Sequence, residues 1–205
     1  DTGYLTFISN TFSPFTIVHR DVTAKAIVNG ETTYHGSLAD AIQAADDETA
    51  VYLLKNVQSG ATIPENKNVD INLGGYTVDA PKTAFIVSEG ATCSIVNGKI
   101  LAGQYGIVNR GTITELNVDV QSLMYAIANG LGEWVDTDGD GDTDTRIEYT
   151  AVLKEISGGN YLAYREPVAY PLAGVFGLYN GTNSVVELIS GGTFQGNSAA
   201  FRNYN

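Results

Sequence analysis

A short apolar and polar pattern recurs along this chain at nearly even spacing. Each copy places an apolar residue two positions before a small polar one, as in Ile107 and Asn109. The polar positions of the copies are Ser88, Asn109, Asn129, Asn180 and Asn203. The steps from Ser88 to Asn109, from Asn109 to Asn129 and from Asn180 to Asn203 are 21, 20 and 23 residues. A period of this length is typical of a solenoid, so we expect each copy to form one coil of a stack.

The copies also predict which side chains share a column of the stack. The apolar anchors are Ile86, Ile107, Ile127, Leu178 and Phe201, and the residues two places before them are Ala84, Tyr105, Tyr125, Phe176 and Ala199. Because side chains two residues apart lie on the same face of a strand, we expect both columns to point into the core. Asparagine tolerates the left-handed backbone of a tight turn, and stacked amides can hydrogen-bond from coil to coil. We therefore interpret the polar column as a ladder, the alternative being unrelated turns.

A second strand follows most copies of the pattern. The segments 95–100, 116–120, 156–161 and 189–194 share an apolar start, a polar or turn-prone middle and an apolar end. Two of them begin with the same four residues, Ile-Ser-Gly-Gly, which supports an internal repeat. The step from Asn129 to Asn180 is 51 residues, so we expect two insertions there, residues 131–150 and 165–171.

The chain enters the repeats through a hairpin and a helix. Asn29-Gly30 separates two β-prone runs, as in a tight hairpin turn, and Ser37 is suited to cap a helix from Leu38 to Ala45. A buried strand is expected at 51–54. The run 24–57 resembles the entry segment of pectate-lyase-like right-handed β-helix modules in exported proteins of Gram-positive bacteria. The resemblance implies an all-β, right-handed parallel β-helix over residues 22–205, a short helix capping its first coil, and an extracellular or cell-surface location.

The two ends of the chain do not show the repeat in complete form. Residues 1–21 form an aromatic extension, which we expect either to cap its own body or to add as a strand to another molecule. The last copy begins at Phe201 and stops at Asn205, leaving an uncovered coil. We expect either a longer parent protein with flanking domains or a second copy that covers this coil, which would give a filament joined head to tail.

Composition narrows the classes of partner. The chain has 205 residues, 23 acidic against 11 basic side chains and a net charge of -12. This charge disfavours nucleic acid and anionic lipid, and no apolar window is long enough to insert into a membrane. The single cysteine, Cys93, is expected to be a small buried side chain without thiol chemistry.

An acidic segment near residues 133–148 is the sharpest local motif. Carboxylates stand at positions one, three, five and nine of a calcium-type loop, with glycine at six; they are Asp136, Asp138, Asp140 and Asp144. Asp142 stands at position seven, where we expect its backbone carbonyl to bind the ion. The twelfth position is Ile147 instead of glutamate, Glu148 follows it, and no helix pattern flanks the loop. We expect a helix-free structural calcium site, the alternative being a solvated acidic loop.

Enzymes that share the resemblance cleave acidic polysaccharides, but their catalytic residues have no counterpart here. Both histidines, His19 and His35, precede the repeats, and the basic residues of the repeats fall at unrelated positions. We expect no catalytic residues and a structural or adhesive role, as a surface module or as a self-assembling subunit. The alternatives are a pectin-degrading lyase or hydrolase, and a carbohydrate-binding module in which late tyrosines stack on glycans. These late tyrosines, in the last third of the chain, are Tyr149, Tyr161, Tyr164, Tyr170, Tyr179 and Tyr204.

Overall fold

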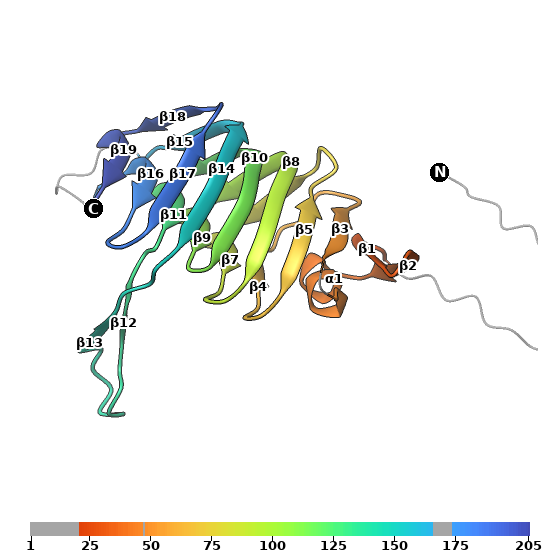
Figure 1. The fold of residues 1–205 in the computed structure, drawn as a ribbon, viewed down its shortest axis with the longest axis horizontal. Coiled ribbons are helices and arrows are strands. Elements are labelled where there is room, and N and C mark those ends of the chain that lie inside the picture. Colours follow the sequence, from red (N-terminus) through yellow and green to blue (C-terminus); the bar gives the residue numbers. More distant parts are fainter. Residues whose placement is uncertain (1–20, 47, 166–173) are drawn as a thin grey trace, which may run out of the picture.

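The computed structural model describes residues 21–46, 48–165 and 174–205. The aromatic extension therefore lies outside the described residues except for Asp21. Almost all regular structure in the described part is β-strand, arranged in two large sheets and one small hairpin, with a single helix (Figure 1). This confirms the all-β prediction. No helix of the described ranges has the length and apolar character needed to cross a bilayer.

The entry segment folds as its sequence predicts. Strands β1 (Ala24–Val28) and β2 (Glu31–His35) pair antiparallel around Asn29 and Gly30, whose φ angles are 51° and 81°. Helix α1 (Leu38–Ala44) begins at Ser37, whose hydroxyl accepts a hydrogen bond from the amide of Asp40 at 3.0 Å. The helix buries its apolar side and contacts β1, β2 and the next two strands of the chain, β3 (Thr49–Leu53) and β4 (Ala61–Ile63).

The larger sheet, sheet A, is parallel apart from its first two strands. Its order is β17-β14-β10-β8-β5-β3-β1-β2. The strands that follow β2 along the chain are β3 (Thr49–Leu53), β5 (Asn68–Asn72), β8 (Thr92–Ala102), β10 (Thr112–Ser122), β14 (Val152–Gly158) and β17 (Val185–Ile189). Three shorter strands extend the sheet to one side: β6 (Thr77–Ala80), β15 (Asn160–Ala163) and β18 (Thr193–Gly196).

Sheet B is parallel throughout and has the order β19-β16-β11-β9-β7-β4. Its strands are β4 (Ala61–Ile63), β7 (Thr83–Val87), β9 (Tyr105–Asn109), β11 (Tyr125–Asn129), β16 (Phe176–Asn180) and β19 (Ala199–Asn203). From β3 onward the chain visits sheet A and sheet B in turn, and each visit adds a strand beside the previous one. Strands about 20 residues apart in sequence are therefore neighbours in space.

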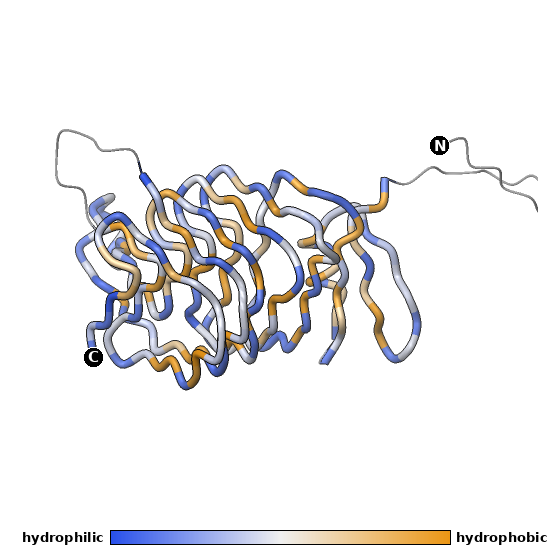
Figure 2. The backbone as a smooth tube through the Cα atoms, turned by 90° about the horizontal axis from the view of Figure 1, so that it is seen from above, coloured by the Kyte–Doolittle hydropathy of each residue, from blue (hydrophilic) through white to orange (hydrophobic). Residues whose placement is uncertain are grey.

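The main core lies between the two sheets. Ile95, Ile100 and Leu116 of sheet A share one buried cluster with Phe85 and Ile107 of sheet B. In Figure 2 apolar segments recur each time the chain passes along the body. Since each strand presents one apolar face to the opposite sheet, burial of these faces is the main force that holds the sheets together.

The predicted register of the first copy is wrong by one residue. Val87, not Ser88, pairs with Asn109, and Phe85, not Ile86, pairs with Ile107. All four residues from Ala84 to Val87 are apolar, so the anchor site stays apolar after a shift by one position and the sequence pattern does not fix the register.

The expectation that the tyrosine column points into the main core is also wrong. Ala126 and Ile127 both belong to the main core, whereas Tyr125 and Ala128 belong to a second cluster. Alternation is therefore interrupted at this pair, and the column of Tyr105, Tyr125 and Phe176 packs apart from the core.

Residues 131–150 form a hairpin that projects from the body (Figure 1). Strands β12 (Glu133–Val135) and β13 (Thr145–Ile147) pair antiparallel and carry the acidic segment at their tip. The second predicted insertion, 165–171, lies outside the described residues except for Arg165.

Candidate functional site

The acidic hairpin is the candidate metal site. The carboxylate of Asp136 accepts hydrogen bonds from the backbone amides of Gly139 at 2.7 Å and Gly141 at 2.8 Å. Both glycines have positive φ, 79° and 97°, which lets the backbone fold around this carboxylate. The two amides, that of Gly141 first, lower the pKa of Asp136 and keep it ionised.

Three of the five predicted ligands are brought together. Asp136, Asp138 and Asp140 each offer one carboxylate oxygen, and these oxygens lie within 4.8 Å of one another. Asp142 and Asp144 are not part of this group, and Asp144 accepts a hydrogen bond from the hydroxyl of Thr145 at 3.1 Å. Clustered oxygens with a glycine bend are the donor set that Ca²⁺ prefers, so the residues fit the expected ion.

A polar clasp joins the base of the hairpin to sheet B. Arg110, directly after β9, forms an ion pair with Glu133 at 2.6 Å and places its guanidinium 4.4 Å from the ring centre of Tyr149. The hydroxyl of Tyr149 donates a hydrogen bond to Glu133 and, with Arg110, lowers the pKa of Glu133. Glu133 therefore anchors the base of the hairpin, and its two carboxylate oxygens bond to Arg110 and Tyr149 instead of to a metal ion.

The asparagine ladder predicted from the repeat is confirmed for four of its five members. Asn109 donates to Asn129 at 2.7 Å, Asn129 to Asn180 at 2.8 Å, and Asn180 to Asn203 at 2.9 Å. Asn109 and Asn129 are fully buried. These asparagines lie at the ends of strands and none has the positive φ expected of a tight turn. Their amides fix the register between strands instead.

Comparison with family models, curated proteins and solved structures finds no match.

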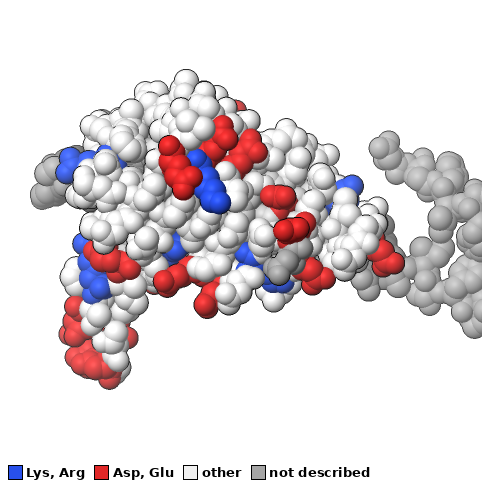
Figure 3. All heavy atoms as spheres, viewed as in Figure 1, with Lys and Arg blue, Asp and Glu red and all other residues white. Residues whose placement is uncertain are grey.

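An acidic groove of about 510 Å³ on the outer face of sheet A had not been anticipated from the sequence. Its carboxylates are Asp70, Glu115 and Glu155, and each accepts a hydrogen bond from a serine hydroxyl: Ser94 at 2.6 Å, Ser157 at 2.7 Å and Ser190 at 2.6 Å respectively. Figure 3 shows this face with several acidic side chains and few basic ones, and the hairpin tip as a second acidic region. Only the register between strands could have predicted this groove from the sequence. It aligns Asp70, Ser94 and Glu115 across β5, β8 and β10.

The late tyrosines are divided between core and surface. Tyr161 and Tyr179 are buried, and Tyr179 stacks on Tyr125 with ring centres 5.1 Å apart. Tyr164 and Tyr204 are exposed, while Tyr170 lies outside the described residues. Tyr161 and Tyr179 therefore pack within the protein and are not accessible for stacking on a glycan.

The described part of the chain shows no catalytic group of side chains around a histidine. His35 lies on β2 and exchanges a hydrogen bond with the hydroxyl of Thr33 at 2.9 Å, and His19 is outside the described residues. Cys93 is buried in β8, and burial raises the pKa of its thiol, as expected for a packing residue.

Proposed function

We propose that the chain is a right-handed parallel β-helix module of the cell surface, structural or adhesive in role, whose copies join head to tail through their end coils. The observation that carries the proposal is the constant register of sheet B, in which each strand from β7 to β19 aligns with the next and the asparagine ladder continues from β9 to β19. A stack of this kind has no intrinsic limit of length, which suits a rod or filament.

The side chains of the last described coil support assembly at that end. Ile189 and Phe201 align with Ile156 and Leu178, which are fully buried, yet they are themselves 46% and 47% exposed. Further coils, of the same polypeptide or of a second copy, would bury these side chains and pair the free edges of β17 and β19. Burial of each side chain contributes roughly 1 kcal/mol or more.

The test is association of the purified chain at rising concentration, followed by light scattering and negative-stain imaging. We expect rods that lengthen with concentration, and Phe201→Lys should shorten or abolish them because it places a charge at the stacking edge. Leu123→Lys is the matched control, since Leu123 is equally exposed but lies away from that edge, between β10 and β11. A particle that stays monomeric at every concentration would contradict head-to-tail assembly.

Calcium in this proposal is structural and is bound at the hairpin tip. Asp136, Asp138 and Asp140 supply the converging oxygens. Asp142 and Asp144 follow in the same loop and would have to move toward these oxygens to complete the site. The ion would neutralise repulsion among carboxylates at the tip, which supports a role in stiffening the hairpin.

The acidic groove of sheet A supports a second candidate, a polysaccharide lyase or hydrolase of the pectin-degrading type. Glu115 and Glu155 line one groove, as the paired carboxylates of a glycoside hydrolase do. Incubation with a panel of pectins and neutral polysaccharides, assayed for reducing or unsaturated ends, decides between the candidates. Sugar release that disappears in Glu115→Gln would favour the enzyme.

A further inference from the structure

Asparagine followed by glycine occurs four times in the chain. The pairs are Asn29-Gly30, Asn97-Gly98, Asn129-Gly130 and Asn180-Gly181. Such a pair is prone to lose its side-chain amide, because glycine has no side chain to hinder attack of its backbone nitrogen on the side-chain carbon of the preceding asparagine. All four pairs share this chemistry, so a large difference between them in the folded chain has to come from the structure.

The first pair, Asn29-Gly30, is open to the reaction. It forms the turn between β1 and β2, where both residues are exposed and both have positive φ. Within the described residues, neither the side chain of Asn29 nor the backbone amide of Gly30 takes part in a hydrogen bond. A Cβ added to Gly30 would meet no atom within 4 Å, so the turn has room to bring the nitrogen of Gly30 to the side chain of Asn29.

The two pairs in the asparagine ladder are held against the same reaction. The amide of Gly130 donates to the carbonyl of Asn109 at 2.8 Å, and the amide of Gly181 donates to the carbonyl of Asn129 at 2.8 Å. The side-chain nitrogens of Asn129 and Asn180 donate within the ladder, and both pairs are buried. The attacking and the leaving nitrogen are therefore both hydrogen-bonded away from water, and reaction requires the coil to open first.

The remaining pair, Asn97-Gly98, is intermediate. Asn97 is exposed and has a φ of 60°, but its side-chain nitrogen donates to the side-chain oxygen of Asn72 at 3.1 Å. A Cβ added to Gly98 would lie 2.3 Å from the Cβ of Leu73, so the backbone of Gly98 has little room to move. We expect reaction at Asn97 to be slower than at Asn29.

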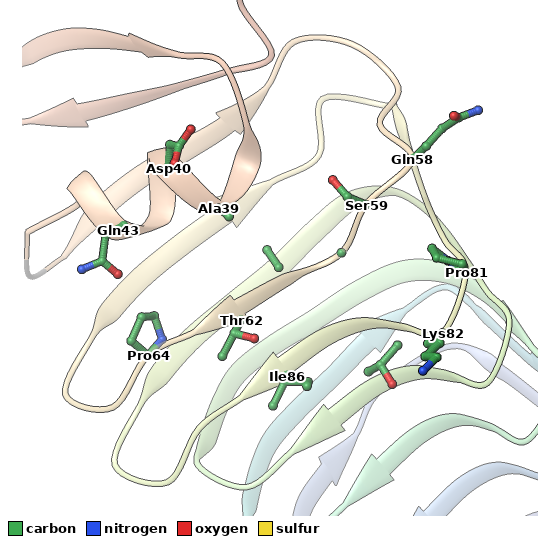
Figure 4. A pocket seen from close by; sticks show the side chains of 13 residues that line it. Ala39, Asp40, Gln43, Gln58, Ser59, Thr62, Pro64, Pro81, Lys82 and Ile86 are labelled. Carbon is green, nitrogen blue, oxygen red and sulfur yellow. The ribbon is translucent and has the colours of Figure 1, made fainter.

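Exposure of a side-chain amide is not sufficient for the reaction. Gln43 and Gln58 are exposed on the groove between helix α1 and β4 (Figure 4). Attack on a glutamine would close a larger ring, and the residues that follow, Ala44 and Ser59, carry side chains that hinder it. These two glutamines are therefore internal controls for simple exposure to solvent.

We propose that Asn29 is a site of spontaneous deamidation in the folded protein, and that the stack protects the identical pairs at 129 and 180. The backbone nitrogen of Gly30 gives its proton to water and bonds to Cγ of Asn29. The bond from Cγ to Nδ2 breaks, and Nδ2 takes up a proton and leaves as ammonia. Water then opens the cyclic imide at one of its two carbonyls, which leaves aspartate or isoaspartate.

Both products change the hairpin at the end of sheet A. Either one adds a negative charge two residues before Glu31. Isoaspartate also inserts a carbon atom into the backbone of a two-residue turn, and the pairing of β1 with β2 depends on the geometry of that turn. We expect isoaspartate at position 29 to weaken this pairing, while the asparagine ladder stays intact.

The test is incubation of the full chain at mildly alkaline pH, in native buffer and in parallel in urea. Peptide mass spectrometry measures the conversion of each asparagine and of Gln43 and Gln58. In native buffer Asn29 should convert at least about tenfold faster than Asn129 and Asn180, because the latter react only after local opening. In urea the four pairs should convert within about threefold of one another, since none is then protected, and both glutamines should stay unchanged.

The variant Asn29→Gly is the matched control, because glycine accepts the positive φ of this turn. It should remove the product at position 29 and leave the rate at Asn97 unchanged. Equal conversion of Asn29 and Asn129 in native buffer would overturn the proposal. So would a tenfold difference that persists in urea, or an Asn29 that reacts only in urea. None of these readouts depends on head-to-tail assembly.

Discussion

Substitution of Asn129 by alanine tests whether the amide ladder sets the stability of the stack. Asn129 accepts from Asn109 and donates to Asn180, both of which are buried, and it also donates to the carbonyl of Val185 at 3.0 Å. Alanine leaves the buried oxygen of Asn180 without this donor, at about 1 to 3 kcal/mol, and removes the bond from Asn109, at about 0.5 to 1.5 kcal/mol. The expected loss in free energy of unfolding is therefore about 1.5 to 4.5 kcal/mol, a large part of a typical domain's stability.

The exposed end of the same ladder provides the control. Asn203 is exposed, and Asn180 retains its bond to the carbonyl of Ser184 at 2.9 Å, so Asn203→Ala should cost less than about 1 kcal/mol because water replaces the lost partner. Urea unfolding followed by circular dichroism measures both variants. Asn129→Leu separates hydrogen bonding from packing, since leucine fills the volume without an amide. Equal losses at 129 and 203, or rescue by leucine, would refute the ladder as the cause.

Three further predictions concern the acidic loop, a buried tyrosine and the single cysteine. Addition of Ca²⁺ should change the fluorescence of Trp134, two residues before Asp136, and Asp136→Asn should weaken the response about tenfold or more whereas Asp46→Asn should not; an indifferent signal argues against the site. Burial raises the pKa of Tyr125 to about 12, so its contribution to stability is complete below pH about 10 and is lost as pH rises through about 12; Tyr125→Phe should lessen the fall in urea midpoint over that interval, and an identical fall would exclude this group. Burial raises the pKa of the Cys93 thiol, so a thiol reagent should label it only after unfolding; rapid native labelling would contradict its burial.

Local features of the chain were predictable because they depend on neighbouring residues. The turn at Asn29-Gly30 needs positive φ, and the helix start at Ser37 needs a side-chain acceptor three residues before an amide. Both signals are complete within a few residues. The sequence also predicted the ladder asparagines, because each follows an apolar anchor at a constant offset.

Features that depend on several strands were harder to predict. The register of the first copy was predicted wrongly by one residue because residues 84–87 include no polar side chain that would distinguish the two faces of the strand. The tyrosine column packs outside the main core because Ala126 and Ile127 both enter that core. The pattern of a single strand does not predict such a break in the alternation of faces. The acidic groove of sheet A was missed for the same reason, since Asp70 and Glu115 are 45 residues apart and meet only through the register of β5, β8 and β10.

The ladder itself explains why a large insertion does not disturb this register. Asn129 and Asn180 bond across 51 residues of sequence, as closely as Asn109 and Asn129 do across 20. The hairpin leaves after Gly130, whose φ of 69° turns the chain out of β11, and returns at Tyr149, whose carbonyl accepts from Ser184. Both ends of the insertion are thus held at one place, and loop length adds little further entropic cost. The amides of the strands fix the register, so the hairpin is free to differ in length and chemistry, and the acidic loop lies where the sheets constrain it least.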